Sequence, residues 1–319
     1  MIAKNFNQAA SHVYCTYFDT GFLSRGLVML RSLRRYDPSS IIVVLAIGEV
    51  PARVLHDVFG SELRVIESEA LHSAVPVLRV IREQRSTWAF YATQKPALAM
   101  FTMGSEILPE SVVYVDADTW FFADPAPIFQ EIGGASVGIS PHRFHAANRN
   151  LNIYGKYNAG WVYWCNNQIG RECLADWRDD CLEWCSEQNQ PDGRFMNQGY
   201  LNRWPERYSN VHVVWNPGAN LAPWNVDGHV LERDGDAVTV DGSPLIFYHF
   251  SGLRRDAGRH WYSSYPKFEQ FDLVNDTIYR PYITALDAEG RRLADTYGIE
   301  GVGAAQSVDE FAPRVRLGP

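Results

Sequence analysis

The sequence predicts an α/β protein with an open, mostly parallel β-sheet covered by helices on both faces, and three observations support this prediction. Residues 41–47 and 111–115 are apolar runs without polar alternation, which is typical of strands buried on both faces. Segments with apolar residues at helical spacing separate these runs, as in repeated βα units. The chain has 319 residues, 46% hydrophobic and 21% charged, which is ordinary for a folded protein of one or two domains.

The first 115 residues alternate between predicted strands and helices. Residues 12–18 form a short apolar run that ends at a polar turn, and the leucines of residues 22–36 recur at helical spacing. Strands follow at 41–47, 63–66 and 111–115, with one helix after Pro51 and another over 87–103 that we expect to be interrupted at Pro96. Because open parallel sheets bind ligands beyond the carboxyl ends of their strands, this order points to Asp19, Asp116 and Asp118.

Beyond residue 135 the pattern changes to a mixture of shorter elements. We expect strands at 135–139, 161–164 and 245–249, a helix over 169–187, a polar hairpin over 234–242 and a last helix over 275–297. The change divides the chain into a main domain over residues 1–255 and a helical C-terminal extension over residues 256–319.

Charge and cysteine content limit the function and the location. A formal net charge of −8 argues against a protein that binds nucleic acid. The five cysteines form no CxxC pair and the N-terminal residues lack a signal-peptide pattern, so we expect structural thiols and a cytoplasmic location. No apolar run approaches the roughly 20 residues that a membrane-spanning helix needs. Peripheral contact with the inner face of the membrane, through arginines near residue 255, stays open.

The triplet Asp116-Ala-Asp118 is the sharpest chemical signal. The spacing alone is weak, because a second copy, Asp234-Gly-Asp236, lies in the predicted hairpin, where Asp and Gly are turn-forming residues. Asp116 and Asp118 differ because apolar sequence flanks them on both sides, so that two carboxylates there are costly unless a cation meets them. A divalent cation would satisfy both and could also hold a nucleoside diphosphate, whereas capping of the following turn is the alternative.

His249 ends a second apolar strand and is the expected partner of the two aspartates. If the two strand ends adjoin, Asp116, Asp118 and His249 form a mixed oxygen and nitrogen site suited to Mn²⁺ or Mg²⁺. Gly252 permits close approach of the backbone to a bound group, and the adjacent Arg254 and Arg255 are candidates for binding phosphate.

Other candidates are a lysine and two groups of side-chain amides. Lys95 could reach a diphosphate, although a surface lysine is the alternative. Asn158 and Gly160, and likewise Asn197 and Gln198, combine amides with glycine among aromatic residues. Because amides both donate and accept hydrogen bonds, these segments suit the hydroxyl groups of a sugar.

In this order, from residue 12 to 255, the motifs resemble those of family 8 glycosyltransferases, which are retaining enzymes with the Rossmann-like GT-A fold. The most specific match is residues 114–129, which resemble the family's metal-binding segment. The resemblance implies that Thr16, Tyr17 and Asp19 contact the nucleoside and that Lys95 faces the donor. It also implies that Asn158 and Gly160 face the donor sugar and that Asn197 and Gln198 face the anomeric carbon. His249 would be the third metal ligand, and Gly252 and Arg255 would bind phosphate. The chain departs from the family at two points, which places it in a distant bacterial branch. It has Asn197-Gln198 in place of Asp-Gln and Arg255-Asp-Ala in place of Lys-Pro-Trp.

These observations give one hypothesis for the function and two alternatives. We expect a glycosyltransferase that uses Mn²⁺ or Mg²⁺ to move a hexose from a UDP-sugar to a saccharide or glycolipid acceptor, with Gln198, Asn197 and Asn158 at the reacting sugar. The resemblance further implies retention of configuration, a role in bacterial surface polysaccharide or lipopolysaccharide synthesis, and contact of the C-terminal extension with the acceptor or the membrane. The alternatives are a nucleotidyltransferase that makes the sugar nucleotide and a non-catalytic protein that binds sugar nucleotides or glycans.

Overall fold

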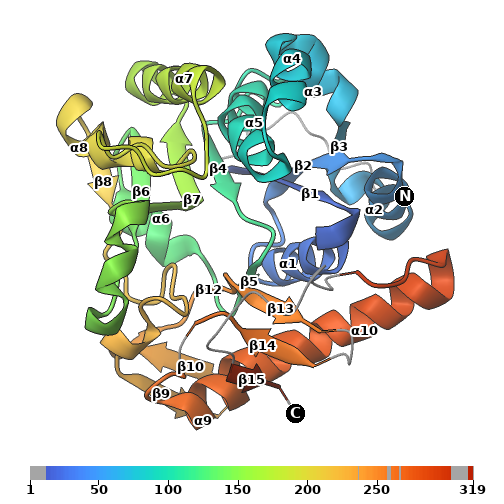
Figure 1. The fold of residues 1–319 in the computed structure, drawn as a ribbon, viewed down its shortest axis with the longest axis vertical. Helices are drawn as coiled ribbons and strands as arrows, with labels where there is room; N and C mark the ends of the chain where they lie inside the picture. The colour runs from blue at the N-terminus through green and yellow to red at the C-terminus, as the bar shows by residue number, and fades with distance from the viewer. Residues whose placement is uncertain (1–11, 236, 257–259, 266, 303–314, 319) are drawn as a thin grey trace.

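The computed structural model describes residues 12–235, 237–256, 260–265, 267–302 and 315–318. Within these residues the core is a seven-stranded sheet in the order β3-β2-β1-β4-β7-β6-β8 (Figure 1). In sheet order the strands are β3 (Arg64–Glu67), β2 (Ile41–Ile47), β1 (Val13–Asp19), β4 (Ser111–Val115), β7 (Tyr157–Cys165), β6 (Val137–Pro141) and β8 (Val211–Val213). Only β7 runs antiparallel to its neighbours in this sheet, so the predicted mostly parallel sheet is confirmed.

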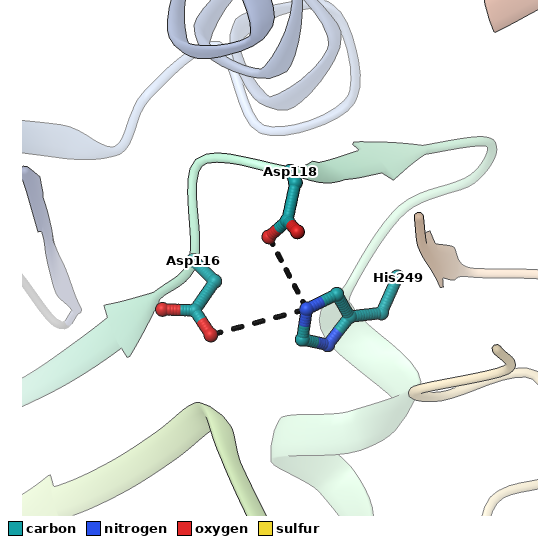
Figure 2. Close-up of side chains that lie close together, drawn as sticks. All are labelled: Asp116, Asp118 and His249. Carbon is teal, nitrogen blue, oxygen red and sulfur yellow. Dashed lines mark ion pairs between the residues drawn. The ribbon is translucent and has the colours of Figure 1, made fainter. Parts of the chain in front are cut away.

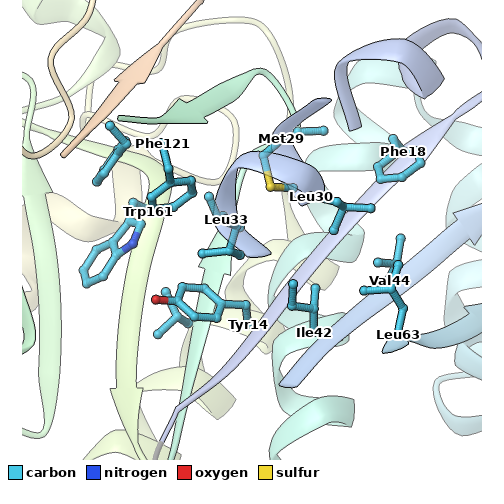
Figure 3. Packing of buried hydrophobic residues seen from close by; sticks show 14 of the residues in the cluster. Tyr14, Phe18, Met29, Leu30, Leu33, Ile42, Val44, Leu63, Phe121 and Trp161 are labelled. Carbon is cyan, nitrogen blue, oxygen red and sulfur yellow. The ribbon is translucent and has the colours of Figure 1, made fainter. Parts of the chain in front are cut away.

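Helices cover both faces of this sheet, as predicted. Side chains alternate along β1, so that Tyr14 and Phe18 pack with helices α1 (Leu23–Tyr36) and α2 (Glu49–Phe59) on one face (Figure 3). Val13 and Cys15 pack on the other face with α5 (Thr87–Met103) and α7 (Gln168–Glu183). Shorter helices are α3 (Ser68–Ala74), α4 (Val77–Gln84), α6 (Ala126–Ile132) and α8 (Trp204–Arg207), with 3-10 turns η1 (Thr20–Phe22), η2 (Gly60–Glu62), η3 (Ala146–Tyr154), η4 (Gly199–Arg203) and η5 (Val226–Gly228).

Two helices differ from their predicted form. Helix α5 continues through Pro96, so the predicted interruption is wrong. A proline removes the amide that would bind the carbonyl four residues earlier, and here the side-chain amide of Asn197 donates to the Ala92 carbonyl instead, at 3.0 Å. Helix α7 ends at Glu183, so Cys185 lies beyond the helix. The described cysteines are free thiols, and all but the half-buried Cys165 are buried, as expected of structural thiols.

A small two-stranded sheet joins two distant parts of the chain. Strand β5 (Thr119–Phe121), which follows β4 after a tight turn, pairs antiparallel with β12 (Phe247–His249) and sets His249 opposite Thr119. The predicted hairpin is also present, as β9 (Leu231–Asp234) and β10 (Ala237–Val240) followed by β11 (Ser243–Pro244), although position 236 lies outside the described residues.

The C-terminal part is only partly helical. Helix α9 (Phe271–Val274), a π-helical turn at Asn275–Tyr279 and α10 (Arg280–Tyr297) match the predicted last helix, and α10 packs against α1 along one edge of the molecule (Figure 1). Strands β13 (Leu253–Arg255), β14 (Trp261–Ser263) and β15 (Val315–Leu317) form a sheet that the sequence did not predict. The proposed boundary at residue 255 falls inside this sheet and stays a prediction. None of the described helices has the length and apolar character needed to cross a bilayer.

The contact between α1 and β1 leads to a first prediction. A Cβ atom at Gly26 would overlap the ring of Phe18, whereas one at Gly290 on α10 would meet no neighbouring atom within 4 Å. Gly26→Ala should therefore destabilise the protein, because overpacking costs about 1–3 kcal/mol and exceeds the gain of about 0.5–1 kcal/mol in helix propensity. Gly290→Ala should stabilise it by that same gain. Urea unfolding of both variants measures the difference, and a Gly26→Ala protein at least as stable as the wild type would contradict this packing.

Candidate functional site

Asp116, Asp118 and His249 converge on one point (Figure 2). The Nε2 atom of His249 lies 3.2 Å from Oδ1 of Asp118 and 3.9 Å from Oδ2 of Asp116. Two ligand atoms that each lie about 2.1 Å from one cation are at most about 4.2 Å apart, so the distances from His249 to the two aspartates fit a single divalent ion. Two carboxylates and one imidazole are also ligands that Mn²⁺ and Mg²⁺ accept. The three residues therefore make a candidate metal site.

The backbone brings these three side chains together. The amide of Asp116 donates to the carbonyl of Gly160 at 2.8 Å, which ties the end of β4 to β7. The chain then turns into β5, whose pairing with β12 places His249 beside the two aspartates. The amide of Phe250 donates to the carbonyl of Asp118 at 2.8 Å and closes the arrangement. The two strand ends thus adjoin through β5 rather than by direct pairing of β4 with β12.

Gly160 is the position where the site is tightest. A Cβ atom there would lie 2.6 Å from Cε1 of His249 and 2.6 Å from Oδ1 of Asn158, so only glycine lets the imidazole approach the strand. The Gly160 amide donates to this Asn158 oxygen at 2.9 Å. Both residues belong to strand β7. The pairing of β7 with β6 shifts in register between Ile139 and Ser140 and then continues to Tyr157.

Lys95 is a buried member of the site, so the alternative of a surface lysine is wrong. Its Nζ lies 2.8 Å from Oδ1 of Asp116 and donates to the carbonyl of Ala159 at 3.0 Å. The hydroxyl of Tyr114 donates to the same Asp116 oxygen at 2.8 Å. Because both donors hold Oδ1, the other oxygen of Asp116 is left facing His249, which is the arrangement that a metal ligand needs.

Asp118 and His249 interact strongly with each other. Burial raises the pKa of Asp118, but His249 and Arg25 outweigh burial and lower this pKa to about 2. Burial lowers the pKa of His249, but the carboxylates of Asp118 and Asp116 outweigh burial and raise it above its usual value. Asp118 is therefore ionised at neutral pH and can bind a cation.

The imidazole of His249 is oriented by packing. Its Nδ1 atom is buried and has no hydrogen-bond partner among the described residues. Many metal-binding histidines donate this second nitrogen to a fixed acceptor. Here the ring lies against Gly160 and meets the edge of Trp224 at a centroid distance of 5.1 Å. Close packing therefore orients the His249 ring, as a hydrogen bond does in other metal sites.

A cavity of about 1140 Å³ opens beside this centre. Its lining includes most of the predicted site residues, namely Tyr17, Asp19, Lys95, Asn158, Asn197 and Gln198 together with Asp116, Asp118 and His249. Asp19 is fixed there, because one oxygen accepts from the Phe22 amide and the other from the Tyr91 hydroxyl. The cavity therefore lies at the carboxyl ends of β1 and β4, where the parallel sheet predicts a ligand.

Four predicted residues do not line this cavity, and one of them, Gly160, lies against the His249 ring. Thr16 is fully buried and lies on the same face of β1 as Tyr14 and Phe18, because side chains alternate along the strand. The Arg255 guanidinium lies 3.4 Å from the Asp287 carboxylate and turns away from the site. Gly252 does not line the cavity either, and its φ of +71° is one that side chains rarely adopt.

Arg25 is the basic residue of the cavity wall that sequence reasoning missed, whereas Arg254 was a phosphate-binding candidate together with Arg255. Arg254 lines the cavity because it points to the opposite side of β13 from Arg255. Arg25 comes from α1, is only 4% exposed and donates to the carbonyl of Leu253 at 2.9 Å. An arginine within the otherwise apolar first turns of a buried helix was the available signal for Arg25. No signal in the sequence distinguished Arg254 from Arg255.

His142 is a further residue that the sequence did not single out. Its Nδ1 lies 2.9 Å from the carbonyl of Gly155, so this nitrogen carries the proton and Nε2 accepts from the Asn158 amide at 3.3 Å. Burial lowers the pKa of His142 to about 3. A neutral imidazole thus fixes the Asn158 side chain at the cavity wall.

The tight packing at Gly160 leads to a second prediction. Gly160→Ala should push the His249 ring away from the two aspartates while leaving all three ligands in the chain, so Mn²⁺ affinity should fall about 10- to 100-fold, as when support around a metal ligand is lost. Isothermal titration with Mn²⁺ measures this affinity. Gly290→Ala makes the same substitution far from the site and should bind as the wild type does. Equal affinity in all three proteins would show that His249 is not a ligand.

No protein-family model matches the chain. The chain is 34% identical over 250 residues to the uncharacterized protein YfnF of Bacillus subtilis (strain 168), covering 76% of this chain and 81% of YfnF. It is 30% identical over 266 residues to the uncharacterized protein YfnD of the same strain, covering 81% of this chain and 83% of YfnD.

Two solved structures share the fold. The galactosyltransferase LgtC, in complex with donor and acceptor sugar analogues, superimposes with a TM-score of 0.53 at 15% identity, over 86% of this chain and 95% of LgtC. An active-site mutant of LgtC gives a TM-score of 0.50 at 14% identity, over 76% of this chain and 88% of that one. The GT-A fold that the resemblance to family 8 implied is thereby confirmed. The chain belongs to the family of YfnF and YfnD, and it has the GT-A fold of LgtC.

Proposed function

We propose that this protein is a metal-dependent glycosyltransferase that moves a hexose from a UDP-sugar to a saccharide acceptor. One observation carries the proposal: Asp116, Asp118 and His249 meet at the wall of a cavity of about 1140 Å³. This cavity lies at the carboxyl ends of parallel strands in a fold shared with a galactosyltransferase. Mn²⁺ or Mg²⁺ bound by the three residues would stabilise the negative charge that develops on the diphosphate as the glycosidic bond breaks.

The basic residues around the metal site support binding of a diphosphate. Lys95, on helix α5, neutralises one oxygen of Asp116. Arg25 and Arg254 lie on the side of Asp118, and within the described residues neither forms a salt bridge. Arg25 is buried and Arg254 is half-buried, and a guanidinium removed from water without a salt-bridge partner is compensated when an anion binds. We infer that these two arginines contact the diphosphate, in place of Arg255.

The remaining walls of the cavity suit sugar rings. Tyr154, Phe195, Trp224 and Tyr265 supply aromatic surfaces. Gln198 donates to the carbonyl of Tyr154 at 3.0 Å, so its amide oxygen stays free to accept from a sugar hydroxyl. Aromatic faces with a few fixed amides are typical of sites that bind uncharged saccharides.

Two alternatives are less well supported. A nucleotidyltransferase of this architecture would need a glycine-rich phosphate loop after β1, but here Asp19 caps the 3-10 turn η1 and its carboxylate would oppose a phosphate. A non-catalytic sugar-nucleotide binder differs from a transferase only in turnover, which the assay below measures. The retaining outcome and the role in surface polysaccharide synthesis remain predictions from the resemblance, and the cytoplasmic location and peripheral membrane contact remain predictions from the sequence.

The two Asp-x-Asp triplets provide a matched test of the metal site. With Mn²⁺ and a panel of UDP-sugars, with and without saccharide acceptors, the wild type should release free UDP. Asp118→Asn should lower the rate at least about 100-fold, which corresponds to about 2.7 kcal/mol of lost transition-state stabilisation. Asp234→Asn alters the second triplet in the β9–β10 hairpin and should keep the wild-type rate. The transferase proposal fails if no UDP-sugar yields UDP, and the metal proposal fails if Asp118→Asn stays active.

Arg254 and the adjacent Arg255 provide a second matched test. Arg254→Met should raise the KM for the donor or lower kcat/KM about 10- to 100-fold, because a charge-assisted hydrogen bond contributes about 1.5–3 kcal/mol. Arg255→Met removes the same charge one position along and should leave donor kinetics nearly unchanged, since Arg255 pairs with Asp287. Steady-state kinetics with the preferred UDP-sugar compares them. The reverse order of effects would assign the diphosphate to Arg255.

A further inference from the structure

Helix α5 contains a carbonyl group that the helix itself cannot satisfy. Pro96 lies inside the helix and has no N–H, so the carbonyl of Ala92, four residues earlier, loses its helical donor. Ala92 is 7% exposed. A buried carbonyl without a partner is costly, so a donor from elsewhere in the chain is required.

The side chain of Asn197 supplies that donor. Its Nδ2 lies 3.0 Å from the Ala92 oxygen, across 105 positions of sequence, and the residue is 5% exposed. The backbone carbonyl of Asn197 accepts from Nε1 of the fully buried Trp177 at 2.7 Å. An ionised aspartate at this position could only accept hydrogen bonds and would repel the Ala92 carbonyl. The amide at 197 is therefore the form that the proline-containing helix requires.

The backbone next to Asn197 must be held in place. Met196 adopts a φ of +46°, a left-handed conformation that is strained for a residue with a side chain. Its amide donates to the carbonyl of Ser186 at 2.9 Å. Gly199 packs so closely that a Cβ atom would lie 2.6 Å from the carbonyl of Gly193. The segment that carries Gln198 is thus fixed on both sides rather than free to adjust.

The bond between Asn197 and Ala92 joins two walls of the cavity. On one side, Lys95 precedes Pro96 and holds Asp116. On the other side, Gln198 follows Asn197, and Lys95 and Gln198 both line the cavity. We propose that Asn197 is a positioning residue: it replaces the donor that Pro96 removes from α5, and it thereby fixes Gln198 relative to Lys95 and the metal site. The expected effect on catalysis rests on the proposed function. The coupling between Asn197 and Pro96 is a property of the fold and is independent of that function.

A double-mutant cycle tests this coupling. Pro96→Ala restores an N–H that can bond the Ala92 carbonyl, so the amide of Asn197 is no longer needed. Asn197→Ala alone should lower the melting temperature and reduce kcat about tenfold or more, because misplaced binding groups slow reaction. In the Pro96→Ala background, the same change should cost less than half as much in both measurements. If Asn197→Ala does not fold, the double variant should still fold.

Additive effects in the cycle, or a double variant that also fails to fold, would overturn the proposal. Asn197→Asp should behave like Asn197→Ala, and a wild-type kcat for Asn197→Asp would also overturn it. Mn²⁺ affinity of Asn197→Ala should stay within about twofold of the wild type, since the three ligands are untouched. If no variant releases UDP, the proposed function fails, while the melting temperatures still decide whether Asn197 and Pro96 are coupled.

Discussion

Two neighbouring carboxylates, Asp116 and Asp118, are the constraint on which the site depends. They follow the buried strand β4, where uncompensated negative charge is costly. The negative charge of Asp116 is compensated by Lys95 of helix α5 and by the Tyr114 hydroxyl, and that of Asp118 by His249. The ligand atoms of all three residues are directed to one point, and a divalent cation there would take over the compensation that protonated His249 supplies, because a metal-binding imidazole must be neutral.

The architecture delivers these compensating groups from distant parts of the chain. Pairing of β5 with β12 brings His249 across about 130 positions of sequence, and the absence of a side chain at Gly160 leaves room for its ring. Helix α5 carries Lys95 to the same place, and its internal Pro96 requires Asn197 from a third segment. The metal site and the cavity wall are therefore parts of one hydrogen-bonded framework.

Sequence reasoning was most accurate where the signal is local. The bounds of β4 and α5 were predicted correctly, because apolar runs and helical spacing are properties of short segments. The rule that parallel strands bind ligands at their carboxyl ends pointed to Asp116 and Asp118, whereas His249 was expected beside them only if the two strand ends adjoined. Sequence reasoning failed where tertiary contacts determine the direction of a side chain. Thr16 faces the core, and Arg254 rather than Arg255 faces the cavity. Strand β15 escaped prediction because its pairing with β14 is long-range.

The central claim is that one divalent cation is held by Asp116, Asp118 and His249. Crystals of the protein grown with Mn²⁺ and UDP, measured at the manganese absorption edge, test it most directly. The account predicts one anomalous peak about 2.1 Å from ligand atoms of all three residues, with the diphosphate on the side of Arg25 and Arg254. A manganese ion bound elsewhere, or a diphosphate bound without contact between the ion and His249, would contradict it.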